Sequence, residues 1–189
     1  MPMPQAAKAH GFTLVEMIIV ITILAIAVGG VSTALFPRGK QSADQIAAVK
    51  AAELGRAVID EVLGRNFDHN SGPNGGLPEC VLSGVSGATC TISTALGPET
   101  GSGESNNTLY NDVDDFNGFN GSARDVLGAT LSEGYQGYNI AIAVYYEDFN
   151  GGVMQGTPST NITNYKRIEV TVTDRQGNQY PFAVIRGNY

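Results

Sequence analysis

The stretch GFTLVEMIIVITILAIAVGGVSTALF, residues 11–36, decides how this chain folds. After Glu16 it contains twenty consecutive residues, 17–36, without a charged side chain. A helix of that length is about 30 Å long, which matches the hydrocarbon core of a bilayer. A helix packed on a soluble core usually keeps a polar face, and this segment has none. The sequence therefore predicts that residues 12–36 form a helix that spans a membrane.

A cleaved secretory signal peptide is the alternative interpretation of this stretch. Lys8 would supply its positively charged start, and the small residues 25–27 (Ala-Ile-Ala) would supply its cleavage site. Two features argue against this alternative. Glu16 interrupts the apolar run near its beginning, and the run continues well past residue 27, to Phe36. The start of the mature protein distinguishes the two, because a signal peptide would take the apolar helix away with it.

Glu16 is the one charged residue inside the apolar stretch. A carboxylate within a bilayer costs about 2.5–3.5 kcal/mol on insertion scales, so an acidic residue there is a candidate for function. A simpler interpretation places Glu16 at the membrane interface, where the N-terminus of a helix favours negative charge. That interpretation does not explain the short polar segment that ends in Gly11 just before the apolar stretch.

The combination of a short leader, Gly11, Phe12, Glu16 and the apolar run resembles the N-terminus of type IV prepilins and pseudopilins. The resemblance implies that residues 1–11 are a leader, that prepilin peptidase cleaves between Gly11 and Phe12, and that the new Phe12 amine is methylated. It also implies that apolar helices pack side by side in a filament, assembled by inner-membrane machinery from this and other pilin subunits. Glu16 of one subunit would then pair with the Phe12 amine of its neighbour. Pairing recovers part of the cost of a buried charge, so the pair would set axial register.

The segment after the apolar run predicts a second helix. Pro37-Arg38-Gly39-Lys40 should break or bend the first helix as it leaves the membrane. Residues 37–65 then form an amphipathic segment, helical from about Ser42, with charges on one face. Its apolar residues should pack on a sheet; they are Ile46, Val49, Val58, Ile59, Val62 and Leu63.

Composition excludes several classes of protein. The net charge of the chain is −7, and no run of basic residues supplies the patch that a nucleic-acid binder needs. Two histidines and two cysteines rule out a His-rich metal site and a zinc ribbon. Cys80 and Cys90 would pair as a disulfide in an oxidising compartment, stabilising the fold by roughly 2–3 kcal/mol. The alternative is two free thiols in a cytoplasmic head.

Residues 66–136 are rich in Gly, Asn, Ser and Pro, and acidic residues concentrate toward their end. Residues 99–148 hold nine acids and one base, most densely in residues 111–118. We expect a solvated acidic turn there. The alternative is that carboxylates and an amide oxygen converge on calcium, with no other cofactor expected. The candidate ligands are Asp112, Asp114, Asp115 and Asn117.

The C-terminal part of the chain predicts strands. Residues 138–146, 166–173 and 179–185 each alternate apolar and polar side chains, and the last two predict a hairpin. Pro181 indicates an edge strand or a bulge. We expect an antiparallel sheet of three to four strands with one face against the second helix. The fold class is α+β, with a head of residues 66–189, and this is also the pilin-like architecture that the resemblance implies.

The sequence favours a structural role over catalysis. Residues 60–68 (DEVLGRNFD) and 110–118 (YNDVDDFNG) resemble segments of MshD-type minor pilins of the mannose-sensitive haemagglutinin pilus. The resemblance implies a minor pilin whose head is periplasmic before assembly and lies on an extracellular pilus afterwards. Two alternatives stay open: an adhesin that binds a surface receptor through residues 66–136, and a pseudopilin of a type II secretion system. An enzyme is not expected, because cleavage after Gly11 would leave His69 as the only histidine.

Overall fold

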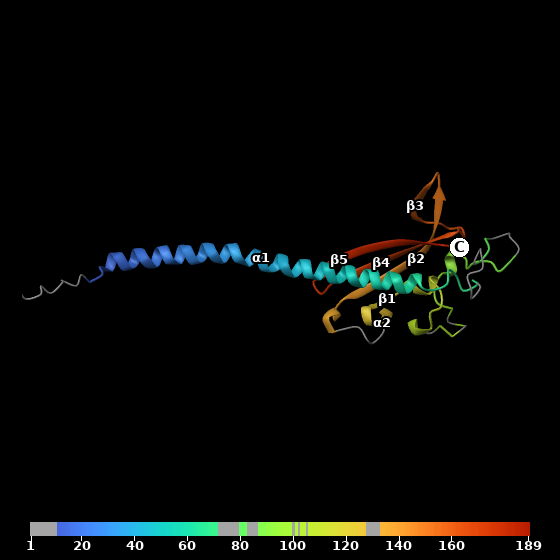
Figure 1. The fold of residues 1–189 in the computed structure, drawn as a ribbon, viewed down its shortest axis with the longest axis horizontal. Helices are drawn as coiled ribbons and strands as arrows, with labels where there is room; N and C mark the ends of the chain where they lie inside the picture. The colour runs from blue at the N-terminus through green and yellow to red at the C-terminus, as the bar shows by residue number, and fades with distance from the viewer. Residues whose placement is uncertain are drawn as a thin grey trace, which may run out of the picture. The chain divides into compact units, whose positions relative to one another are not determined.

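The computed structural model describes residues 11–71, 80–82, 87–99, 101, 103–104, 106–127 and 133–189, without the side chains of residues 36–42 and 124. The chain divides into two compact units, Met1–Ile46 and Ala47–Tyr189. Of the predicted leader, residues 1–11, only Gly11 lies within the described residues. Figure 1 shows the elements in chain order.

Helix α1, Leu14–Leu63, contributes to both units. Of the break or bend predicted at residues 37–40, the break is wrong, because the helical hydrogen-bond pattern continues through these residues. Proline removes only one backbone donor and costs about 3 kcal/mol inside a helix. Long helical segments on both sides already fix the neighbouring turns, so helix formation propagates across the proline.

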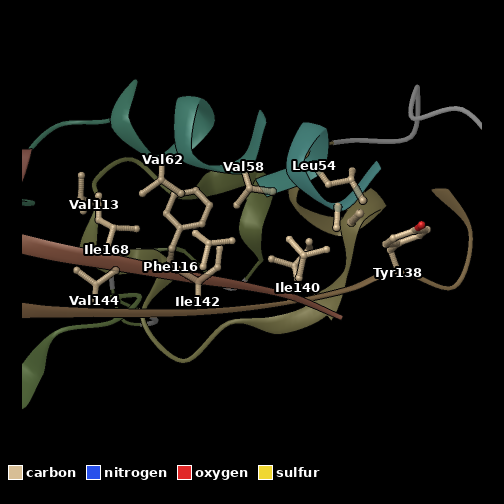
Figure 2. Packing of buried hydrophobic residues seen from close by; sticks show 14 residues of the cluster. Leu54, Val58, Val62, Val113, Phe116, Tyr138, Ile140, Ile142, Val144 and Ile168 are labelled. Carbon is tan, nitrogen blue, oxygen red and sulfur yellow. The ribbon is translucent and has the colours of Figure 1, made fainter. Parts of the chain in front are cut away.

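The C-terminal part of α1 buries one face against the sheet, as expected. The buried residues recur at steps of three and four: Ala47, Ala51, Leu54, Val58 and Val62. In Figure 2, Leu54, Val58 and Val62 point from the helix toward side chains of two strands. Ile46 and Val49 were expected on this face but are exposed, because they fall outside the stripe that Ala47 and Ala51 begin.

The sheet has five strands, all paired antiparallel. They are β1 (Asn120–Ser122), β2 (Asn139–Asn150), β3 (Val153–Pro158), β4 (Tyr165–Thr173) and β5 (Gln179–Gly187). Their order is β1-β2-β4-β5, and β3 pairs with the C-terminal end of β2. The fold is α+β, as predicted. Figure 1 shows β2, β4 and β5 beside the C-terminal part of α1.

The three strands that the sequence predicts are β2, β4 and β5, and β4 and β5 make the predicted hairpin. The two added strands are short. Strand β1 is only three residues long and includes a glycine, so no alternation marks it. Pro181 lies on β5, which is an edge strand of the sheet. Edge strands tolerate proline, as expected from the sequence.

Close packing joins α1 to the edge of the sheet at Gly55. A Cβ atom built there would lie 2.5 Å from the ring of Phe182 on β5. Any larger residue at this position would therefore require the Phe182 ring to move. The buried side chains of α1, β2 and β4 form the main core, completed by Val113, Phe116 and Ala123.

The region between helix and sheet is mostly irregular, as expected. The short helices described there are η1 (Ser93–Ala95), η3 (Asn107–Leu109), η4 (Asp114–Phe116), α2 (Ala123–Leu127) and η5 (Glu133–Tyr135). Cys80 and Cys90 form a buried disulfide with 5.1 Å between their Cα atoms. The Asn188 side chain accepts a hydrogen bond from the Cys80 N–H and donates one to the Cys80 carbonyl, so this loop is tied to the C-terminus.

Candidate functional site

The apolar half of α1 is exposed on all sides. Leu14–Leu35 has a mean hydropathy of 2.6, none of it is buried within the chain, and it is long and apolar enough to cross a membrane. Exposed apolar surface of this extent is not tolerated by a soluble monomer and marks a contact with lipid or with other chains. Phe12, just before this segment, is also exposed.

Polar groups inside the segment are satisfied by the helix itself, with one exception. The hydroxyls of Thr22, Ser32 and Thr33 each donate to a backbone carbonyl three or four residues earlier. This is the arrangement that a water-free environment demands. Within the part of the chain that the structure describes, the carboxylate of Glu16 has neither a hydrogen bond nor an ion pair.

The backbone at Glu16 explains where this acid stands in the helix. Thr13 caps α1: its carbonyl accepts from the Met17 N–H at 3.2 Å, and its hydroxyl accepts from the Glu16 N–H at 3.2 Å. Glu16 is thus in the first helical turn, where the helix dipole favours negative charge. The dipole stabilises Glu16 only in part and provides no counter-ion.

A second cluster of charged groups lies in the head, and it is buried. Its backbone frame is η4 with the residues before it. Asp112 Oδ1 accepts from the N–H groups of Asp114 and Asp115, at 2.8 and 3.3 Å. Asp115 Oδ2 accepts in turn from the N–H groups of Asn111 and Asp112. Val113 and Phe116 insert into the core from the same segment, which carries the acids between them below the surface.

Lys166 supplies the positive charge of this cluster. Its Nζ donates to the Phe67 carbonyl at 2.7 Å, to Asp68 Oδ2 at 3.0 Å and to Asp114 Oδ1 at 2.5 Å. All three ammonium protons therefore have acceptors. The ammonium also lies 4.5 Å from the centre of the Phe67 ring and 5.3 Å from that of Tyr146. Lys166, Asp68 and Asp114 are inaccessible to solvent, so the ion pairs are fully buried.

One lysine does not balance the acids around it. Burial, the charge of Asp114 and a hydrogen bond shared with that residue raise the pKa of Asp112 to about 9. Burial and a hydrogen bond shared with Glu104 raise the pKa of Glu99 to about 8. Both side chains are therefore neutral acids at pH 7 unless a positive charge replaces the proton.

Asp68 shows the opposite balance. Burial acts to raise its pKa, but the charge of Lys166 and hydrogen bonds from Asn70 and Thr91 outweigh burial and lower it. Lys166 thus keeps Asp68 ionised, but it does not compensate the charge of the carboxyl groups that lie farther away.

The candidate calcium ligands are only partly together. Asp112, Asp114 and Asp115 lie in one buried cluster, so the expected solvated acidic turn is wrong: the apolar neighbours of these acids draw the turn into the core. Asn117 is separate. Its Nδ2 donates to the Leu96 carbonyl, and its Oδ1 accepts from the Val144 N–H of β2. Its amide therefore fixes a loop to the sheet.

Comparison with known proteins bears on the N-terminus. Residues 6–32 match the family described as the prokaryotic N-terminal methylation motif. This chain has a prepilin-type N-terminus. No curated protein and no solved structure matches the chain.

The prepilin-type motif supports a type IV pilin-like or pseudopilin subunit, which is a structural component. It implies processing by prepilin peptidase and assembly with pilin machinery in the membrane. Together with the single apolar helix near the N-terminus, it is consistent with a single-pass inner-membrane protein.

Sequence reasoning found the prepilin-type segment but missed the role of Lys166. The sequence contained a signal for this role. Lys166 alternates in step with Ile168, Val170 and Val172, so it lies on the same buried face of β4 as these core residues. A lysine on the inward face of a strand predicts a buried acidic partner. Which acids would reach it was not evident, because Asp68 and Asp114 lie 98 and 52 residues away in the chain.

Proposed function

We propose that this protein is a minor type IV pilin, a structural subunit that enters or primes a surface pilus after cleavage between Gly11 and Phe12. The observation that carries the proposal is the contrast within α1. Its first half is exposed, apolar and contains one acid without a partner in the described chain, whereas its second half is packed against a sheet.

Packing in a filament would cover the apolar surface of the first half of α1 and give Glu16 a counter-ion. Neighbouring apolar helices cover its surface, and the methylated Phe12 amine of one neighbour pairs with Glu16. Position matters more than strength in such a pair, because a one-turn slip would leave a charge unpaired among apolar side chains. The pair thereby specifies the axial register of the subunit.

The subfamily assignment rests on the two segments that resemble MshD-type minor pilins. Residues 60–68 and 110–118 lie together in the structure, joined by a bridge between Asn66 and Asp112 and by the Lys166 ion pairs to Asp68 and Asp114. The two segments therefore belong to one structural unit, and this supports the proposal of an MshD-type head.

Replacing Glu16 tests the assembly role. We expect Glu16→Ala to leave the protein in the membrane fraction and processed at Phe12, while its amount in purified pili falls at least about tenfold, the equivalent of about 1.4 kcal/mol of lost pairing. Asp44→Ala, an exposed acid later on the same helix, is the matched control and should assemble normally.

Quantitative immunoblots of sheared pili and of membranes measure both variants. Normal incorporation of Glu16→Ala would contradict the register argument. Absence of the wild-type protein from pili, with correct processing, would assign it instead to a secretion pseudopilus. A mature protein that starts after Ala27 would remove the proposal altogether.

A further inference from the structure

The head contains carboxylate oxygens that are buried without a hydrogen-bond partner. Among the residues that the structure describes, these atoms are Glu99 Oε2, Asp112 Oδ2, Asp114 Oδ2 and Asp115 Oδ1. The three aspartates are almost completely inaccessible to solvent. A buried carboxylate oxygen without a partner is costly, and native structures rarely retain one without a proton, water or ion beside it.

Three of the acids in this cluster converge on one point. Glu99, Glu104 and Asp115 each present a carboxylate oxygen, and these oxygens all lie within 4.8 Å of one another. Two oxygens on opposite sides of a calcium ion, at bonds of about 2.4 Å, are separated by about the same distance. A second group of three shares this spacing: His69, Glu99 and Asp112.

The existing contacts hold these side chains in place and leave oxygens free to bind. Glu104 accepts hydrogen bonds from the Glu99 N–H and from the Asn111 side chain. Asp115 Oδ2 accepts from two backbone N–H groups, which leaves its Oδ1 without a partner. The ligands are thereby oriented before any ion arrives, which lowers the entropy lost on binding.

We propose that Glu99, Glu104 and Asp115, with Asp112 beside them, bind one calcium ion in the head. All four are hard oxygen donors, which suits the large and adaptable coordination shell of calcium. Magnesium demands near-octahedral geometry at shorter distances. The raised pKa values of Glu99 and Asp112 agree with the proposal, because they mark acids whose ionised form lacks a compensating charge.

This site differs from the set that the sequence pattern suggests. Asn117 is not a ligand, and Glu99 and Glu104 join from an earlier loop. The ion would connect Glu99 and Glu104 to η4 and so to the core. The inference concerns the stability of the head and goes beyond the proposed filament role, which does not depend on it.

Thermal unfolding of the full-length protein in detergent micelles tests the site. With about 5 mM calcium chloride in place of a chelator, we expect the Tm to rise by about 2–9 °C, given the affinity typical of extracellular calcium sites. The same concentration of magnesium should give less than half of this rise.

Asp115→Asn distinguishes a calcium ligand from a structural residue. The amide oxygen can still accept both backbone hydrogen bonds, so in chelator the Tm should equal or exceed that of the wild type, since one repelling charge is gone. The calcium response should disappear. Asp60→Asn is the matched control, an exposed acid on α1, and should keep the full response.

Three results would overturn the proposal: a wild-type Tm that calcium does not raise, an equal rise with magnesium, or an Asp115→Asn variant that still responds. If Asp115→Asn does not fold, Glu99→Gln carries the same test, because the half-buried Glu99 carboxylate makes fewer contacts.

Discussion

Glu16 lies in an apolar helix and Lys166 lies on the buried face of a strand, but of the two only Lys166 has counter-ions among the described residues. Lys166 has two carboxylates and a carbonyl around its ammonium. Glu16 has a helix N-terminus and, in the described part of the chain, no opposite charge. A buried charge left unpaired strongly destabilises a fold, so each must be compensated somewhere. Among the described residues, the head therefore supplies the counter-ions of Lys166, whereas none lies beside Glu16.

The largest effect on stability should come from breaking the buried ion pairs of Lys166. Lys166→Met leaves Asp68 and Asp114 buried without their cation, and we expect the free energy of unfolding to fall by about 3–5 kcal/mol. Chemical denaturation of the full-length protein in detergent measures this loss. Arg56→Met removes an exposed ion pair at 3.8 Å and should change nothing measurable. A loss below about 1 kcal/mol for Lys166→Met would show that the pair does not support the head.

A leucine pair on α1 sharpens the comparison between the two halves. Leu54 is 2% exposed and packs in the core, so Leu54→Ala should lower the free energy of unfolding of the head by about 2–4 kcal/mol. Leu24 is 60% exposed, so Leu24→Ala should leave the unfolding of the head unchanged. Equal effects on unfolding, measured by the same denaturation, would contradict the independence of the two halves.

The smallest effect concerns a charge at the turn between β4 and β5. Burial acts to raise the pKa of Asp174, but hydrogen bonds from Asn178, Gln176 and Tyr180 outweigh burial and lower it. A lowered pKa contributes stability above the ordinary value of 3.8, and this contribution is lost as the pH falls through the lowered pKa.

Asp174→Asn should accordingly be less stable than the wild type at pH 7, with the difference vanishing at low pH. Thermal unfolding between pH 2 and pH 7 measures it, on the order of 1 kcal/mol for lost charge-assisted hydrogen bonds. A difference that stays constant with pH would mean that the ionised form plays no part.

Periodicity in the sequence was enough to predict the main elements. The apolar run, the helical face that includes Val58 and Val62, and the strands β2, β4 and β5 all appear as expected, because each depends on a pattern within one segment. The break at Pro37 did not occur, and the short strands β1 and β3 were not foreseen. Pairing with β2 defines both strands, and their own residues carry little alternation.

The acidic turn shows where sequence reasoning stops. Asp112, Asp114 and Asp115 look like a solvated turn when their own segment is considered alone. Their burial follows from Val113 and Phe116 entering a core built by distant strands, and their neighbours Glu99 and Glu104 arrive from another loop. No pattern within a single segment predicts that these carboxylates come together.

The sequence by itself determined that the N-terminal half of α1 is apolar on every side, carries one acid and overlaps a prepilin-type motif, because hydropathy and a contiguous motif are properties of a single segment. The tertiary structure alone decided which charges are compensated. Lys166 and its two acids come from three separate regions of the chain, and the carboxylates of the proposed calcium site come from two. Electrostatic energy in a buried site depends on distances of a few ångströms, and only the folded chain sets those distances.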